Sequence, residues 1–386
     1  MEMELENTAQ VREKYCWVKY SENKLMELER KILQVLRSTY RTWFVPIETT
    51  IGTGDKIWTI LLNEESKNTP LVLLHGFAAA LGFWCLNLDS LAKDRPVYAI
   101  DLLGFGRSSR PNFSTDSAEA EQQMVQSLEA WRKQLEIENF ILLGHSFGGY
   151  LATSYAIKHP DRVKHLILAD PWGFNERPAK VEAPLWLKAI AYPLSYFNPL
   201  ATVRAAGPIG PWLVRKVRGD ISEKFAHVLE KDTISEYIYQ CNSRKPTGET
   251  AFQTMKTGFW AKNPMMHRFD SIRDDMPITF IFGEDSWMTQ TPGHTLKEQR
   301  PKSYVDIAIV PDAGHHVNAD QPLLFNSAVI NACNVCVGSD SETETIKPKQ
   351  EINGNGEIEN DNIDIDDEGT VHQIKMNQND DYQIHS

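Results

Sequence analysis

Short, almost wholly apolar segments that alternate with helical patterns constrain the fold of this chain more than any other feature of its sequence. The segments are rich in Val, Ile, Leu and Phe, and most lack the alternation of polar and apolar residues expected of a strand with one wet face. Buried strands that alternate with helices predict a parallel sheet covered by helices on both faces. The predicted strands are residues 56–62, 70–76, 95–101, 140–145, 164–170, 277–283 and 304–310, with a helix at 118–135.

The strand–helix alternation is interrupted between residues 171 and 263, where prolines, tryptophans and short helical patterns replace it. We interpret this region as an insertion that forms a helical cap above the sheet. Within it, residues 189–203 are uncharged, but Pro193 and Pro199 exclude a straight helix through a membrane. The stretch is either core of the cap or an apolar lid over a lipid-like substrate. As a lid, it would contact lipid through Tyr192, Tyr196, Phe197 and Leu200.

The two ends of the chain differ in composition from its middle. Residues 21–38 place apolar side chains on one helical face, which indicates a helix packed on the body or lying on a membrane surface. After residue 336 the apolar content is too low for a packed structure, so we expect disorder. The expected segments are an N-terminal amphipathic or membrane-contact segment (1–55), a core in two parts (56–170 and 264–336), the cap (171–263) and a disordered acidic tail (337–386).

The formal net charge of −12 is concentrated in the tail, because 13 of the 52 acidic residues but only 3 of the 40 basic residues follow residue 336. No concentrated basic region indicates nucleic-acid binding. The N-terminus lacks the apolar run of a secretory signal, and no stretch reaches the roughly 18 apolar residues of a membrane span. The 5 cysteines are irregularly spaced, which favours a reducing compartment. We therefore expect a cytoplasmic protein without a metal or a cofactor.

The sequence GHSFG at residues 144–148 joins a predicted strand to a predicted helix. Gly-x-Ser-x-Gly at such a junction is typical of a nucleophilic serine held in a sharp turn. In folds of this kind the acid and then the histidine follow the serine along the chain. His315 follows the last predicted strand and is the predicted base, with His316 as the second choice. Ser146 is the predicted nucleophile.

Three residues are candidates for the acid that should orient the histidine. It is expected a few residues beyond Gly283, at the end of the next-to-last predicted strand, but Ser, Trp, Met and Thr occupy positions 286–289. Asp285 is nearest and is our first prediction. Glu284 and Asp170, the latter at the end of an earlier strand, are the alternatives.

A serine hydrolase also needs backbone N–H groups that stabilise the negative charge on the reacting oxygen. One donor should be Phe147, directly after the predicted nucleophile. The second should be Phe77 or Ala78, because the strand that ends at His75-Gly76 is followed there by a turn.

Five longer segments of the chain form a recognisable set. They are SKNTPLVLLHGF (66–77), RPVYAIDLLGFGRSSRP (95–111), RVKHLILADPWGF (162–174), YFNPLATVRAAGP (196–208) and GHHVNADQP (314–322). Together they closely resemble α/β-hydrolase domain-containing proteins four and five. The resemblance extends from about residue 43 to 337 and implies the α/β-hydrolase fold with its cap. One branch of the family looks like lysophospholipid and N-acylphosphatidylethanolamine hydrolases. The other is a lipid-droplet co-activator of a triacylglycerol lipase, with asparagine at the nucleophile position.

The resemblance implies a serine hydrolase of acyl-lipid esters, because Ser146 stands where the co-activator lacks its nucleophile. The family's usual acid aligns with Thr289, so the acid in this chain departs from the family pattern. A family acyltransferase activity on lysophosphatidate is attributed to a His-x4-Asp motif, which here is His315 to Asp320. The implied partners are a lipid substrate, the surface of a lipid droplet or internal membrane, and a triacylglycerol lipase. A lipase scaffold and an acyltransferase are thus the alternative functions.

Overall fold

The computed structural model describes residue 17, residues 20–178 and residues 199–340. Three of the predicted lipid-contact residues, Tyr192, Tyr196 and Phe197, lie outside the described residues, and so does the tail from residue 341. None of the helices in the described part combines the length and the apolar composition that a membrane span requires.

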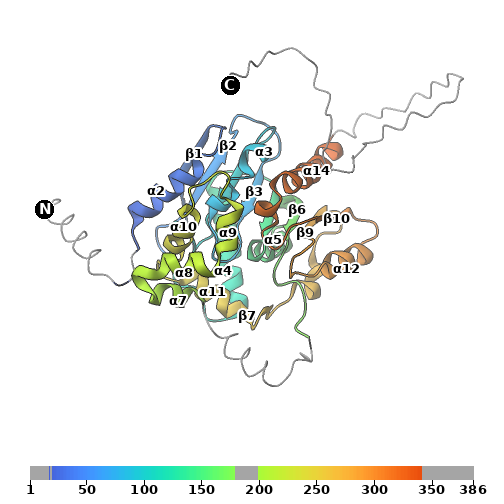
Figure 1. Cartoon of the computed structure of the whole chain (residues 1–386). Helices are drawn as coiled ribbons and strands as arrows, with labels where there is room; N and C mark the ends of the chain where they lie inside the picture. Colours follow the sequence, from blue (N-terminus) through green and yellow to red (C-terminus); the bar gives the residue numbers. More distant parts are fainter. Residues whose placement is uncertain (1–16, 18–19, 179–198, 341–386) are drawn as a thin grey trace, which may run out of the picture. The chain divides into compact units, whose positions relative to one another are not determined.

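The described chain is built around an 8-stranded sheet with the strand order β1-β2-β4-β3-β5-β6-β9-β10 (Figure 1). β2 is antiparallel to both β1 and β4, whereas β4, β3, β5, β6, β9 and β10 run parallel. The bounds are β1 Tyr40–Ile47, β2 Asp55–Leu62, β3 Leu71–Leu74, β4 Val97–Ile100, β5 Phe140–His145, β6 Val163–Ala169, β9 Ile278–Gly283 and β10 Val305–Val310. The predicted mostly parallel sheet is confirmed.

Helices cover both faces of the sheet. Successive strand residues point to opposite faces, and the side chains on both faces are apolar. In β3, Val72 and Leu74 belong to one apolar cluster, whereas Leu71 and Leu73 belong to another. The first cluster includes side chains of α4 and α5, and the second includes side chains of α3 and α14. The helices outside the cap are α2 Glu22–Leu33, α3 Leu88–Leu91, α4 Ser117–Gln134, α5 Phe147–Lys158, α12 Thr291–Gln299, α13 Val317–Asp320 and α14 Pro322–Asp340, with 3₁₀ turns at Leu81–Trp84, Pro160–Arg162 and Met265–Ser271.

β1 was not predicted from the sequence. It pairs with β2 along its whole length, from Tyr40 opposite Leu62 to Ile47 opposite Asp55. β1 is at the edge of the sheet, so much of it is exposed and its apolar pattern is weak, although Val45 and Ile47 are buried. The predicted boundary after residue 55 is corrected accordingly, because residues 40–47 belong to the sheet.

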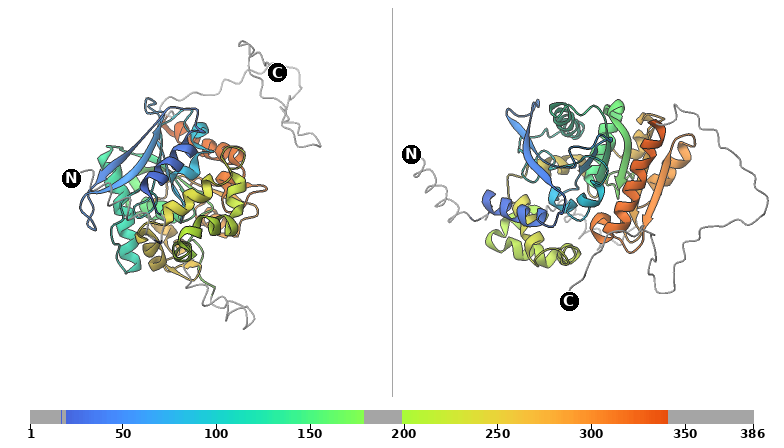
Figure 2. Two further views of the ribbon diagram at one scale, coloured as in Figure 1. Left: turned by 60° about the vertical axis from the view of Figure 1, so that its left-hand side comes forward. Right: turned by 90° about the horizontal axis from the view of Figure 1, so that it is seen from above.

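The amphipathic helix α2 lies against the cap (Figure 1 and Figure 2). Ser21 caps its N-terminus by accepting a hydrogen bond from the amide of Lys24. Leu25, Leu28 and Ile32 on its apolar face are at most 2 % exposed and share a cluster with aromatic side chains of α10. The apolar face is therefore covered by protein, as in the first of the two alternatives predicted for this helix, and it is not available for the membrane contact of the second.

The described part of the cap consists of short helices and one small hairpin. They are α7 Pro199–Ala205, α8 Gly210–Val217, α9 Gly219–Lys224, α10 Thr233–Asn242, α11 Thr247–Met255, a 3₁₀ turn at Gly207–Ile209, and the strands β7 Lys256–Thr257 and β8 Trp260–Ala261. α7 packs on α8 and α10, and Leu200 is only 8 % exposed. The lipid contact predicted for Leu200 is thus corrected, because this side chain is buried within the cap.

Candidate active site

Ser146 lies in the sharp turn between β5 and α5, with φ 53° and ψ −118°. This backbone conformation is strained for a residue with a side chain. Neighbouring glycines allow it: a Cβ on Gly144 would lie 2.3 Å from the Gly148 carbonyl oxygen, and one on Gly148 would lie 2.4 Å from the Leu74 carbonyl oxygen. Larger residues at these two positions would therefore push the strand and the helix apart. The glycines of the sequence pattern thus hold Ser146 in this turn.

His315 connects Ser146 to a buried carboxylate. Its Nε2 lies 2.9 Å from Ser146 Oγ, and its Nδ1 lies 2.5 Å from Asp170 Oδ2. Asp170 is fully buried, and an acceptor-only carboxylate there requires the proton of the neutral imidazole to reside on Nδ1. Nε2 then carries the lone pair that accepts the hydroxyl proton of Ser146. The series can therefore activate a serine hydroxyl.

The carboxylate beside His315 belongs to Asp170 and not to Asp285. The predicted acid is corrected accordingly. Asp285 and Glu284 are exposed in the turn after β9. β6 and β9 are parallel neighbours, so their carboxyl ends meet at one edge of the sheet. An acid after either strand can reach the same histidine, and in this chain the residue after β6 does so.

The surroundings of Asp170 hold its carboxylate beside the imidazole. The hydroxyl of Ser286 donates to Asp170 Oδ2, and the amide of Asp170 donates to the Ile281 carbonyl at 2.8 Å. The other oxygen, Oδ1, is buried without a hydrogen-bond partner among the described residues. Thr289, at the family's usual acid position, instead bonds Asn175 at the surface, with 3.0 Å between Oγ1 and Nδ2.

His145 was not predicted as a site residue, and it contacts the loop that carries the base. Its Nε2–H donates to the carbonyl of His315 at 2.8 Å and so holds the loop of the base in place. Burial, with a smaller effect of the nearby His315, lowers the pKa of His145 to about 3, so the ring stays neutral at ordinary pH. His316, the second choice for the base, has its Nε2 3.2 Å from Arg218 Nη2 rather than at Ser146.

The predicted backbone donors belong to two segments near Ser146, the start of α5 and the turn after β3. Phe147 is the first residue of α5, so its N–H has no acceptor within the helix. Ala78 has φ 61°, and its carbonyl accepts a hydrogen bond from Asn242 Nδ2 of α10 at 2.9 Å. At Gly76 an added Cβ would lie 3.1 Å from the Cβ of Ser146, which brings the turn containing Phe77 close to the nucleophile.

A buried histidine fixes the backbone of this turn. The amide of Leu102 donates to His75 Nε2 at 3.0 Å, so Nδ1 carries the proton and donates to the Gly76 carbonyl at 2.7 Å. Burial lowers the pKa of His75 to about 4, which keeps the ring neutral. The sequence pair His75-Gly76 thus contributes a hydrogen bond as well as a small residue.

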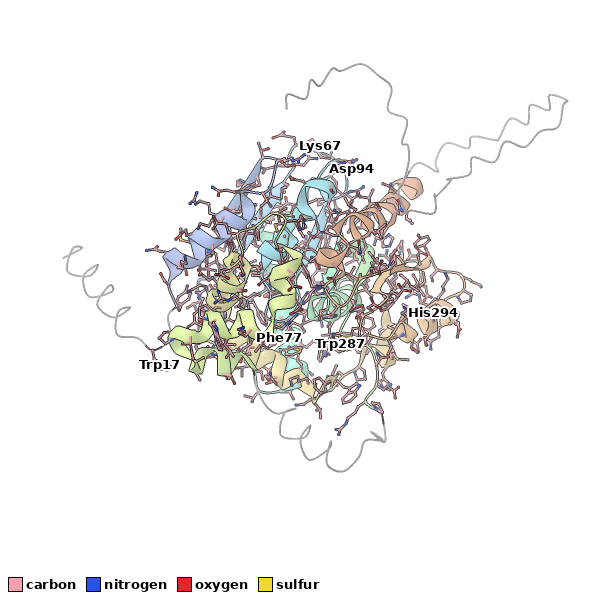
Figure 3. The ribbon with its side chains drawn as sticks, in the orientation of Figure 1. Trp17, Lys67, Phe77, Asp94, Trp287 and His294 are labelled. Carbon is pink, nitrogen blue, oxygen red and sulfur yellow. The ribbon has the colours of Figure 1, made fainter. Side chains whose placement is uncertain are left out.

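A cavity of about 370 Å³ opens above Ser146 and His315. Five aromatic side chains line it, namely Phe77, Trp172, Phe252, Phe259 and Trp287. Phe77 and Trp287 are labelled in Figure 3, and the Trp287 ring centroid lies 5.1 Å from that of His315. A larger cleft of about 540 Å³ lies beside Glu121, but neither Ser146 nor His315 lines it. Ser146 and His315 therefore line the smaller, more apolar of these two cavities.

Asp320, the last residue of the His-x4-Asp motif, does not bond the imidazole. Its Oδ2 accepts from the amide of Gly314 at 3.0 Å, and its Oδ1 pairs with Lys224 of α9. Asp320 therefore links the loop of His315 to the cap. Within residues 20–178 and 199–340, no three His, Cys, Asp or Glu side chains gather as ligands for a metal ion.

The chain belongs to the alpha/beta hydrolase fold family, whose model matches residues 69–322. It is 50 % identical over 319 residues to the human (Lyso)-N-acylphosphatidylethanolamine lipase, a match that covers 81 % of this chain and 92 % of that protein. It is also 47 % identical over 319 residues to the mouse 1-acylglycerol-3-phosphate O-acyltransferase ABHD5, covering 81 % and 90 %. These relatives confirm the resemblance found in the sequence.

Solved structures support the same fold. Naproxen esterase (carboxylesterase NP) from Bacillus subtilis superimposes with a TM-score of 0.54 at 19 % identity, over 81 % of this chain and 98 % of the esterase. At this identity the likeness supports the arrangement of strands and helices alone.

Proposed function

We propose that this protein is a serine hydrolase of acyl-lipid esters, acting on lysophospholipid and N-acylphospholipid substrates. The hydrogen-bonded series from Ser146 through His315 to Asp170 carries the proposal. Ser146 Oγ attacks the acyl carbon while His315 Nε2 takes its proton, and Asp170 orients and stabilises the imidazolium. His315 then protonates the departing alcohol, and a water molecule releases the fatty acid by the reverse sequence of proton transfers.

The oxyanion of each tetrahedral intermediate is proposed to lie between two backbone donors. Phe147 supplies one N–H from the start of α5, and Phe77 or Ala78 supplies the other from the turn after β3. The hydrogen bonds of His75 and Asn242 support this arrangement because they hold that turn before any substrate binds. Such preorganised donors stabilise the negative charge as it develops.

The substrate class rests on the cavity and on the two relatives. Aromatic walls favour the acyl chain of a lipid. The human relative is named a lipase of (lyso)-N-acylphosphatidylethanolamine, and the mouse relative an acyltransferase of 1-acylglycerol-3-phosphate. Both names specify glycerophospholipids with acyl groups, and we extend this class to the present chain.

We further propose that the protein works at the surface of a lipid droplet or internal membrane. Phe259 and Trp287 both line the cavity, yet they are 64 % and 62 % exposed. Burial of one such side chain in acyl chains contributes roughly 1.5–3 kcal/mol. The two rings at the cavity rim can therefore bring the site to an aggregated substrate.

Acyl transfer is the second candidate, favoured by the name of the mouse relative. The same acyl-enzyme would react with the hydroxyl of lysophosphatidate instead of water, and His315 would take the hydroxyl proton. Asp320 would then act only indirectly, because its carboxylate bonds Gly314 in the loop of His315 and Lys224 in α9.

The proposal is tested with a fluorophosphonate probe, a short soluble ester and a lysophospholipid. The wild type should be labelled and hydrolyse both esters, whereas Ser146→Ala should lose labelling and about 10⁶-fold in kcat. Ser271→Ala, at an exposed serine outside the cavity, is the matched control and should behave as the wild type. Adding lysophosphatidate and measuring phosphatidate separates transfer from hydrolysis.

A wild type that is neither labelled nor active would overturn the proposed function. In that case the non-enzymatic alternative, a scaffold that binds a triacylglycerol lipase at the droplet, would be preferred. Stimulation of such a lipase by Ser146→Ala as strongly as by the wild type would support that alternative.

A further inference from the structure

The walls of the cavity above Ser146 carry positive charge. Lys256, at the start of β7, and Arg218, between α8 and α9, both line it. Among the described residues that line this cavity none is Asp or Glu. Five of the other lining residues are Phe or Trp, including Phe252 and Phe259. A cavity of this composition suits a ligand that is apolar at one end and anionic at the other.

Lys256 is half-buried at the junction of α11 and the small hairpin. Its ammonium donates to the Gly258 carbonyl at 3.1 Å, which directs the side chain along the hairpin. Burial lowers the pKa of Lys256, because the ammonium has lost part of its hydration there. An anionic ligand atom would accept a charge-assisted hydrogen bond from this ammonium, which is stronger than a bond between neutral groups.

Arg218 is oriented by its neighbours. Its Nε and Nη2 donate to the two carboxylate oxygens of Asp220 at 3.0 and 2.9 Å, and Nη2 also lies 3.2 Å from His316 Nε2. The side chain is 45 % exposed, so solvent screens its charge more than that of a buried group. Because Lys256 is less exposed than Arg218, solvent screens its charge less, and we expect Lys256 to have the larger effect.

We propose that Lys256, together with Arg218, binds the phosphate of the substrate and thereby selects anionic acyl lipids over neutral acyl esters. This inference rests on the proposed function, because it places the phosphate relative to an ester attacked by Ser146. The acyl chain would lie along the aromatic wall. The phosphate, joined to the ester through the glycerol backbone, would reach the two cations. Both residues would then determine specificity without taking part in the covalent steps.

The test compares two substrates with the same acyl chain, lysophosphatidate and a neutral monoacylglycerol, in the same uncharged detergent micelles. Lys256→Met should lower kcat/KM for lysophosphatidate by about tenfold to a hundredfold, mainly through KM, because a hydrogen bond to a charged group is lost. Hydrolysis of the monoacylglycerol should not change. Lys256→Arg should retain most of the preference, and Arg218→Gln should give a smaller loss than Lys256→Met.

Lys262→Met is the matched control, since this exposed lysine follows β8 and does not line the cavity. It should leave both substrates unaffected, and an equal loss there would assign the effect to net charge and overturn the inference. The rate of fluorophosphonate labelling of Lys256→Met reports whether Ser146 and its neighbours are intact. A labelled Lys256→Met variant that loses activity equally on both substrates also contradicts the phosphate assignment.

The carboxylate of the fatty-acid product is another anion that could occupy this position. If Lys256→Met relieves inhibition by oleate but leaves the substrate ratio unchanged, the cation receives the product and the inference is overturned. A wild type that hydrolyses neither substrate and is not labelled would overturn the proposed function itself, and this inference with it. A labelled wild type without a phosphate preference would overturn the inference alone.

Discussion

Glu29 and Asp170 are both buried carboxylates, 2 % and 0 % exposed, but their neighbours differ. Glu29 on α2 accepts hydrogen bonds from Trp58 Nε1 at 2.8 Å, Arg107 Nη1 at 2.9 Å and the hydroxyl of Tyr237 at 3.1 Å. These partners come from the sheet, the loop after β4 and the cap. Glu29 therefore joins three parts of the molecule.

Asp170 has fewer partners and an unsatisfied oxygen. Its Oδ2 faces His315 and Ser286, while Oδ1 is buried without a partner in the described part of the chain. Its backbone is also in the left-handed region, with φ 43°. A carboxylate that mainly stabilises the fold is expected to have all its oxygens bonded, whereas a functional one often retains strain. The difference supports a stabilising role for Glu29 and the proposed role of Asp170 in the reaction.

The largest expected effect is on Asp170. Asp170→Asn should lower kcat about 10⁴-fold, because the amide would favour the wrong tautomer of His315. The melting temperature should change little, since the shape of the side chain is retained. Asp285→Asn, at an exposed position, is the control and should keep wild-type kcat. The reverse pattern, with the loss at Asp285, would return the acid to the turn after β9.

The next largest effect should be on stability. Glu29→Ala should lower the free energy of unfolding by about 3–5 kcal/mol, because buried Arg107 loses the buried carboxylate that accepts its hydrogen bond and keeps only the more exposed Glu22. Chemical denaturation measures this change. The folded fraction should retain kcat on a short soluble ester, in contrast to Asp170→Asn. A loss of kcat with unchanged stability would mean that the two carboxylates do not differ as described.

A smaller effect on the reaction is expected at Ser286. Ser286→Ala removes one hydrogen bond to a charged acceptor, worth about 1.5–3 kcal/mol, so kcat should fall about tenfold to a hundredfold. Thr289→Ala provides the control, because that hydroxyl bonds Asn175 at the surface. Equal effects of the two substitutions on kcat would show that Ser286 has no particular influence on Asp170.

The last expected effect is a pH dependence of stability, which is small over any one pH unit. Burial, and then the nearby Asp101, raise the pKa of Glu29 from 4.5 to about 7. Between these values the folded protein holds a proton that the unfolded chain has released, so stability falls as pH rises from about 4.5 to 7. The slope from one proton is at most about 1.4 kcal/mol per pH unit. Melting curves of Glu29→Gln should lack this contribution, and identical pH profiles would contradict it.

Much of the sheet and the sharp turn that holds Ser146 could be predicted from the sequence because both depend on local patterns. A strand buried on both faces needs a continuous apolar run, and residues 140–145 and 278–283 have one. The turn at Ser146 needs glycines at fixed spacing, because Gly144 and Gly148 touch neighbouring backbone. These requirements act within a few residues, so they are visible without a tertiary structure. β1 was not predicted because a strand at the edge of a sheet needs no continuous apolar run.

The tertiary structure alone decided which acid meets His315 and what covers the apolar face of α2. Asp170 and Ser286 are 116 positions apart in the sequence, and they meet because β6 and β9 are neighbours in the sheet. Local sequence cannot distinguish acids at the ends of two adjacent parallel strands. Likewise, the pattern of α2 determines that one face seeks an apolar environment, and the packing of α10 determines that this environment is protein. Periodicity specifies that a face is buried, whereas the partner depends on contacts between distant segments.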